Sequence, residues 1–153
     1  MAGKSGSVPA FRLLPNRAKE LTFIRACLQK WNDDGIAWSD MAVIYCNHQL
    51  GDALMRELNQ NDIPNIWMGD KNIRRNYDPT ENKVLLVTRQ SSKGLEFPRV
   101  IVAGLGCLKD DEEAKPEEAR LLYVAMTRAQ EYLLLTSSVN NHYTQRLSEV
   151  NLT

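Results

Sequence analysis

The sequence has few of the residues that build disulfide frameworks or zinc sites. It contains three cysteines, widely spaced and without a Cys-x-x-Cys pair, and only two histidines among 153 residues. We therefore expect no metal ligands, and a reducing cytoplasm is the favoured location. Glycine (8) and proline (6) are also too scarce for a collagen-like or low-complexity chain.

Long apolar runs are missing as well. The longest nearly unbroken run, residues 100–108, is about half the length of a membrane-spanning helix. No apolar segment follows a basic start, so we expect neither a membrane span nor a signal peptide. The 43% hydrophobic and 25% charged residues are typical of a globular domain. We predict one domain over residues 9–153, after a disordered or expression-derived tail at residues 1–8.

The sequence has no excess of one charge, but its charges are unevenly placed. Residues 71–99 hold seven basic and three acidic side chains, a balance of +4, and residues 110–118 hold six acidic side chains and one lysine, a balance of −5. Overall neutrality argues against a dedicated high-affinity nucleic-acid module standing alone. A basic loop on one side of the fold remains compatible with this composition.

Short apolar runs predict the strands of a sheet. We expect them at residues 9–14 (an edge strand), 41–45, 66–68, 84–87, 100–103 and 132–136. Helical spacing predicts a helix that Asn16 caps and that extends to about residue 32, a second at 50–58, a third from Pro116 to Ala129, and a terminal helix. This alternation predicts an α/β fold of three layers with a mostly parallel sheet, in which ligands bind beyond the carboxyl ends of the strands.

The segment after the 84–87 strand is the first candidate site. Gly94 permits a close backbone approach, Lys93 carries a charge suited to phosphate, and Glu96 can accept a hydrogen bond from a ribose hydroxyl. A loop of serine, lysine and glycine is, however, more often a solvated turn.

The helix at residues 117–129 is the second candidate site. Helical spacing places Arg120, Val124 and Arg128 on one ridge, with Ala129 in the buried stripe of the helix. The structural alternative for Arg128 is a side chain that satisfies carbonyls at the C-terminal end of this helix.

These two segments resemble motifs of a known family. Residues 92–97 (SKGLEF), followed by Pro98 and an apolar strand, resemble motif V of superfamily 1 helicases of the UvrD/Rep/PcrA type. Residues 117–129 (EEARLLYVAMTRA) resemble motif VI, and residues 132–136 are similar to the strand that follows it. The resemblance covers residues 16–138, and two long motifs in the right order are more specific than either alone.

The resemblance implies the second RecA-like motor domain of an ATP-dependent DNA helicase or translocase. In that family ATP, with Mg²⁺, lies between two RecA-like domains, and single-stranded DNA crosses both; the magnesium ligands are expected on the first domain. Arg128 matches the catalytic motif VI arginine that reaches the γ-phosphate. The resemblance and the side-chain chemistry together predict nucleotide contacts at Gly94, Glu96, Lys93, Arg120 and Arg128, and DNA contacts at Thr88, Gln90, Ser91, Asn47 and His48.

The sequence also departs from this family. Gln90 stands where motif V usually carries histidine, and Cys46 stands where the preceding loop usually carries arginine. The stretch between Trp67 and Val84 is too short for the accessory subdomain that is often inserted there. Residues 3–5 (GKS) imitate the end of a Walker A motif without its strand, so we expect the first motor domain to be absent and this chain alone to be inactive.

Other functions remain open on the residues alone. The chain could be a stand-alone, non-catalytic RecA-like domain that binds nucleic acid or a partner protein. An unrelated nucleotide-binding enzyme ranks last, because no Gly-x-Gly-x-x-Gly loop follows the first strand. Trp67 could stack on a base, but at the end of a strand it is more often a packing residue.

Overall fold

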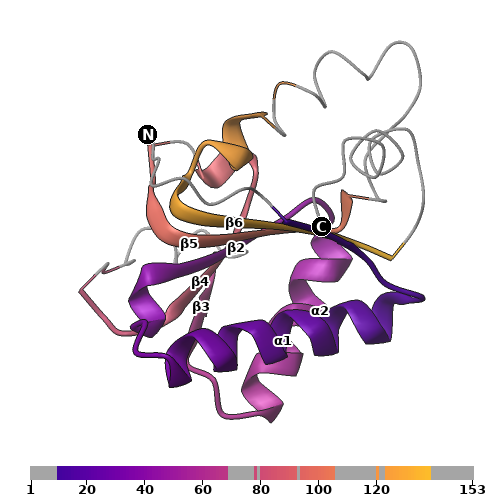
Figure 1. The fold of residues 1–153 in the computed structure, drawn as a ribbon, viewed down its shortest axis with the longest axis horizontal. Helices are drawn as coiled ribbons and strands as arrows, with labels where there is room; N and C mark the ends of the chain where they lie inside the picture. Colours follow the sequence, from indigo (N-terminus) through magenta and orange to yellow (C-terminus); the bar gives the residue numbers. More distant parts are fainter. Residues whose placement is uncertain are drawn as a thin grey trace.

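The computed structural model describes residues 10–68, 78, 80–92, 94–105, 120 and 123–138. Strands and helices alternate through these residues (Figure 1). Short 3₁₀ turns lie at Trp38–Asp40 (η1) and Gln90–Ser92 (η2). The main elements are β1 (Ala10–Leu13), α1 (Arg17–Asp33), β2 (Met41–Tyr45), α2 (His48–Gln60), β3 (Asn65–Trp67), β4 (Val84–Thr88), β5 (Phe97–Ala103) and β6 (Ala129–Ser137).

The strands form one six-stranded sheet in the order β1-β6-β5-β2-β4-β3. Every neighbouring pair is parallel, and β2 lies centrally, with Val43 opposite Leu86 of β4 and Ile101 of β5. The predicted α/β fold with a parallel sheet is confirmed, and β1 is an edge strand as expected. No helix among the described segments is long and apolar enough to cross a bilayer.

Both faces of the sheet are buried, which explains the continuous apolar runs. Alternate side chains of the central strands enter two hydrophobic clusters, so that Ile44 and Val87 belong to one, and Val43 and Leu86 to the other. Helices α1 and α2 cover the second cluster, and Figure 1 shows both on the same side of the sheet. The short helical turn that contains Ala125 covers the first cluster from the opposite side.

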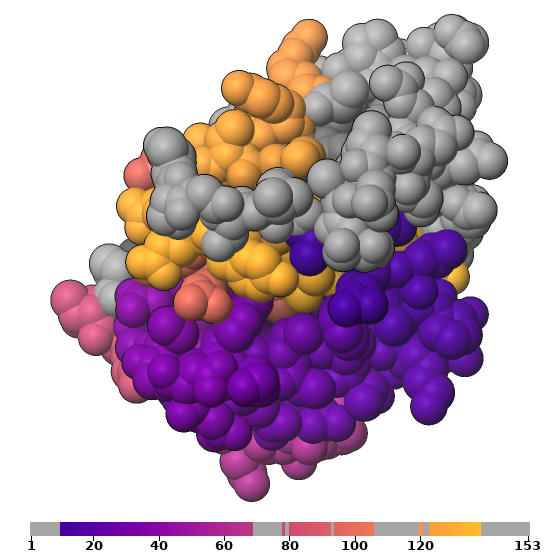
Figure 2. Space-filling view, in the orientation of Figure 1, coloured from indigo at the N-terminus to yellow at the C-terminus, as the bar shows by residue number. Residues whose placement is uncertain are grey.

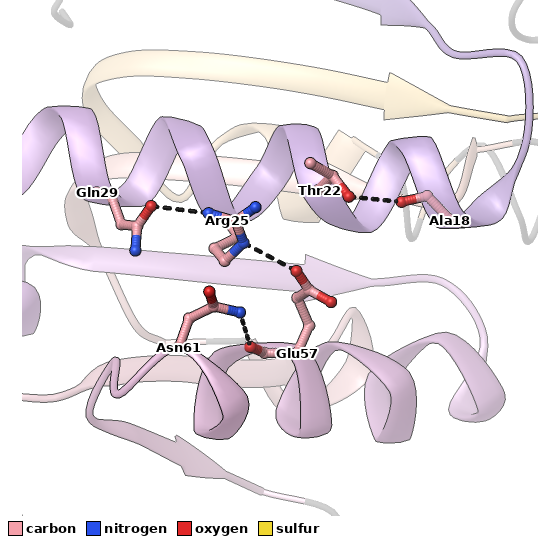
Figure 3. Close-up of polar contacts among 6 residues, drawn as sticks. All are labelled: Ala18, Thr22, Arg25, Gln29, Glu57 and Asn61. Carbon is pink, nitrogen blue, oxygen red and sulfur yellow. Dashed lines mark hydrogen bonds and ion pairs between the residues drawn. The ribbon is translucent and has the colours of Figure 1, made fainter.

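Polar side chains join α1 to α2 (Figure 3). Arg25 Nε donates to Glu57 Oε2 at 2.8 Å, and Arg25 Nη1 donates to Gln29 Oε1 at 2.9 Å. Near the end of α2, Asn61 Nδ2 donates to the carbonyl of Glu57 at 2.9 Å. The Arg25 and Glu57 side chains are each about one-fifth exposed (22% and 21%), so solvent screens only part of this ion pair.

Several predicted boundaries were wrong, with the largest differences at the starts of β5 and β6. Strand β5 begins at Phe97 rather than at residue 100, and its register with β6 shifts between Phe97 and Arg99, around Pro98, which has no N–H for a ladder bond. The helix before β6 ends earlier than predicted, because residues 127 and 128 form a turn and Ala129 already pairs with Phe97. The expectations for the tail at residues 1–8, Lys93, Pro116, the acidic segment and the terminal helix lie outside the described residues.

Candidate functional site

A small pocket lies at the carboxyl ends of β2 and β4. Because these strands are parallel neighbours, with Tyr45 opposite Thr88, the segments that follow them adjoin. The pocket has a volume of about 170 Å³ and is lined by Tyr45, Cys46, Asn47, His48, Thr88, Arg89 and Gln90. The fold therefore brings together Asn47, His48, Thr88 and Gln90, all predicted as DNA contacts.

One wall of this pocket is the N-terminal end of α2. Asn47 is the N-cap, and its side-chain oxygen accepts a hydrogen bond from Leu50 N at 3.1 Å. His48 is the first helical residue, and its ring meets the Tyr45 ring edge-on at a centroid distance of 6.4 Å. The N-terminal N–H groups of a helix carry partial positive charge, which favours an anionic ligand on this wall.

Tyr45 is fixed from two sides. Its hydroxyl oxygen accepts a hydrogen bond from Trp67 Nε1 of β3 at 3.1 Å. Its ring packs so closely on Gly51 of α2 that a Cβ there would lie 2.5 Å from a ring carbon. Trp67 therefore has a packing role at this edge of the sheet, which is the structural alternative to base stacking.

The opposite wall of the pocket follows β4 and contains a residue that sequence reasoning missed. Arg89 is only 7% exposed and lines the pocket. Turn η2 holds its backbone, because the carbonyl of Arg89 accepts hydrogen bonds from Ser92 Oγ at 2.7 Å and from Ser92 N at 3.3 Å. Ser91, a predicted DNA contact, donates its backbone N–H to Thr88 Oγ1 at 3.1 Å and does not line the pocket. The sequence signal that could have indicated Arg89 is a charged residue placed directly after a buried strand.

A second group of predicted residues lies at the amino end of β5. Arg128 occupies the turn between the short helix and β6, and its guanidinium makes three hydrogen bonds. Its Nε donates to the carbonyl of Val124 at 3.1 Å, its Nη1 to the carbonyl of Leu95 at 3.2 Å, and its Nη2 to Thr127 Oγ1 at 3.1 Å. The side chain thus satisfies a helix-end carbonyl, as the structural alternative expects, and also reaches the motif V segment.

The nucleotide candidates of motif V adjoin Arg128. Gly94 has a φ of +81°, and a Cβ there would meet nothing within 4 Å, so the backbone conformation rather than crowding favours glycine. Glu96 accepts a hydrogen bond from Gln130 Nε2 at 3.4 Å. Arg120 is helical and exposed, but the single ridge predicted for Arg120 and Arg128 was wrong, because Arg128 lies beyond the helix.

The two groups of predicted residues lie at opposite edges of the sheet, one at the carboxyl ends of its strands and the other at their amino ends. The pocket lies at the carboxyl end of β4, whereas Glu96 and Arg128 lie at the amino ends of the parallel strands β5 and β6. The segment from Thr88 to Phe97 connects these edges, so one loop carries residues of both groups. In the space-filling view (Figure 2), the yellow β6 region lies between the indigo-to-purple N-terminal part of the chain and the orange short helix that precedes β6.

Comparison with known proteins gives consistent matches. The family described as the UvrD-like helicase C-terminal domain matches residues 70–140. The ATP-dependent DNA helicase PcrA of Staphylococcus aureus is 40% identical over 70 residues, which is 40% of this chain and 10% of that protein. PcrA of Staphylococcus epidermidis is 40% identical over 68 residues, which is 39% of this chain and 9% of that protein. The aligned segment thus spans about a tenth of these relatives.

A solved structure extends the likeness to most of the fold. The C-terminal domain of a possible DNA helicase from Lactobacillus plantarum WCFS1 superposes with a TM-score of 0.67 at 25% identity, covering 90% of this chain and 83% of that one. The match therefore reaches beyond residues 70–140 into the segment that contributes β2, α2 and the first wall of the pocket.

Proposed function

We propose that the chain is the second RecA-like motor domain of an ATP-dependent DNA helicase or translocase, because residues 70–140 match the UvrD-like helicase C-terminal domain and a C-terminal domain of a possible DNA helicase superposes on most of the chain. The single observation that carries this proposal is the loop from Thr88 to Phe97. It begins in a polar pocket at one edge of the sheet and ends in contact with Arg128 at the other. Such a loop would join a nucleic-acid contact to a nucleotide contact within ten residues of the chain.

The nucleotide half of the proposed function rests on Arg128, Glu96 and Gly94. This set fits ATP chemically, because a guanidinium fork matches a phosphate edge and a carboxylate can accept from a ribose hydroxyl. ATP bound with Mg²⁺ would supply the phosphoryl group, and the first motor domain would supply the magnesium ligands. Arg128 would exchange one of its present hydrogen bonds for the γ-phosphate and stabilise the charge that develops there.

The nucleic-acid half rests on the pocket at the carboxyl ends of β2 and β4. Hydroxyl, amide and imidazole groups of Thr88, Gln90, Asn47 and His48 converge there, and the N-terminal end of α2 adds positive potential. These groups suit the sugar–phosphate backbone of single-stranded DNA, which is recognised without regard to sequence.

Two ATPase assays test the proposal. The chain by itself should hydrolyse no ATP, because Arg128 and its neighbours form only one side of an inter-domain site. A protein that also contains the first motor domain should hydrolyse ATP, and single-stranded DNA should stimulate it. Turnover by the chain alone that disappears in Arg128→Ala would contradict the proposal that this chain supplies only one side of the ATP site. A two-domain protein without DNA-stimulated turnover would contradict it as well.

Binding by the chain alone separates this function from the stand-alone alternative. A motor half with a local balance of +4 over residues 71–99 should bind labelled oligonucleotides weakly, and less at higher salt. Fluorescence anisotropy at two salt concentrations measures this. Tight binding that persists at high salt would indicate a dedicated nucleic-acid module instead.

A further inference from the structure

We propose that Arg89 is the phosphate-binding residue of the pocket at the carboxyl ends of β2 and β4, where it contacts the backbone of a single-stranded nucleic acid. The inference rests on the proposed function, and it adds a charged contact that Gln90 does not supply. Among the described residues that line this pocket, Arg89 is the one arginine, and none is a lysine.

The side chain of Arg89 carries its charge in a mostly buried position. The residue is 7% exposed, and it follows the last residue of β4 directly. The guanidinium group of an arginine carries a positive charge and five N–H donors. In partly buried surroundings the attraction between this charge and an anion is screened less than on an open surface.

The backbone around Arg89 is held in place before any ligand binds. Two hydrogen bonds from Ser92 fix the Arg89 carbonyl, and the hydroxyl of Thr88 accepts from Ser91 N at 3.1 Å. These contacts belong to turn η2, whose first residue, Gln90, lines the pocket together with Arg89. A donor on a fixed turn loses less conformational freedom on binding than one on a mobile loop.

The remaining walls of the pocket suit a phosphodiester group. The N-terminal end of α2, at His48, and Arg89 both line this cavity, and a helix terminus and a guanidinium each favour an anion. The cavity, at about 170 Å³, is smaller than the roughly 300–1,000 Å³ of typical small-molecule sites. A phosphate with its flanking sugar atoms is therefore the expected occupant, rather than a whole nucleotide.

Two variants that each remove one positive charge test the role of Arg89. Arg89→Met keeps most of the side-chain volume and removes the charge. Arg56→Met is the control, because Arg56 lies two turns further along α2, is 70% exposed and pairs with Asp52. Fluorescence anisotropy with a labelled oligothymidylate should show affinity reduced about 5- to 20-fold for Arg89→Met and within about 2-fold of the parent for Arg56→Met.

The dependence on salt gives a second readout. Losing one phosphate contact should make the slope of log K against log salt less negative by about 0.7 for Arg89→Met, whereas Arg56→Met should keep the parent slope. Equal affinity and slope in the two variants would overturn the role of Arg89 and leave the proposed function standing. A parent chain that binds no oligonucleotide would overturn both.

A measurement on the unmodified chain covers the case in which Arg89→Met does not fold. When the oligonucleotide is titrated into the isotope-labelled protein, the NMR resonance of Arg89 Nε–H should shift, and that of Arg56 Nε–H should stay in place. A resonance of Arg89 that does not move under conditions of saturated binding would overturn the inference.

Discussion

Replacing the buried carboxylate of Glu20 should destabilise the whole carboxyl edge of the sheet. Glu20 lies in the first turn of α1 and is 1% exposed. Its Oε2 accepts a hydrogen bond from Thr136 Oγ1 of β6 at 2.7 Å and another from Gly104 N, just after β5, at 3.0 Å. One side chain thus joins α1 to the ends of two neighbouring strands.

The expected loss in the free energy of unfolding follows from the hydrogen bonds that each donor would lose. Hydrogen bonds to a charged group contribute about 1.5–3 kcal/mol each, and an orphaned buried donor costs about 1–3 kcal/mol. Gly104 N also donates to the carbonyl of Thr136 at 3.1 Å, so it would keep one partner. The Thr136 hydroxyl is fully buried and would lose its carboxylate acceptor. Glu20→Ala should therefore lower the free energy of unfolding by about 2–4 kcal/mol.

Urea unfolding of a double-mutant cycle measures this effect. Glu20→Ala, Thr136→Val and the double variant should show a coupling energy of about 1–2 kcal/mol. Glu20→Gln should be the milder change, because an amide oxygen can accept the same two hydrogen bonds. Glu131→Ala is the control, since that side chain is 53% exposed and lies 3.7 Å from Arg99. A loss in Glu20→Ala no larger than in this control, or zero coupling, would refute the reasoning.

Two substitutions and one labelling measurement test other parts of the fold. Asn16→Ala should lower stability by about 1 kcal/mol in thermal unfolding, because the Asn16 side chain accepts from Lys19 N at 2.9 Å as the N-cap of α1; an unchanged melting temperature would contradict this. Gly51→Ala should cost about 1–3 kcal/mol, since the added Cβ forces the Tyr45 ring to move; wild-type stability in urea would show that the ring is free to shift. Burial raises the pKa of the Cys27 thiol, against a smaller lowering by the nearby Arg12, so alkylation of Cys27 at pH 8 should be slower in the folded chain than in denaturant; equal rates by mass spectrometry would contradict it.

The elements that the sequence predicted well are those with a local cause. The run at residues 41–45 is apolar at every position and became β2, buried throughout. Asn16 has the side chain that a helix start needs, and α1 begins directly after it. The gathering of Asn47 and Thr88 reflects a general property of parallel sheets, because Thr88 ends β4 and Asn47 lies two residues beyond the end of its neighbour β2.

The features that were missed depend on residues far away in the chain. Glu20 has the pattern of a solvated first-turn acid, and its burial comes from a partner 116 residues away, Thr136. Arg89 stands in a polar run typical of a loop, and only the turn back to Ser92 and the closeness of α2 place it in a pocket. The early end of the helix at residues 127 and 128 likewise reflects the pairing of Ala129 with Phe97, which local spacing does not contain.

The most direct test of the proposed function is the ATP turnover of Arg128→Ala in a protein that contains both motor domains. If Arg128 acts on the γ-phosphate, kcat should fall by about 10³-fold or more. The melting temperature should change little, since the lost hydrogen bonds are to part-exposed carbonyls and a hydroxyl. Arg128→Lys should rescue poorly, because an ammonium lacks the planar fork, and Arg120→Ala should lose less. An Arg128→Ala protein that is less stable but hydrolyses ATP at the parent rate would contradict the account and leave Arg128 as a helix cap.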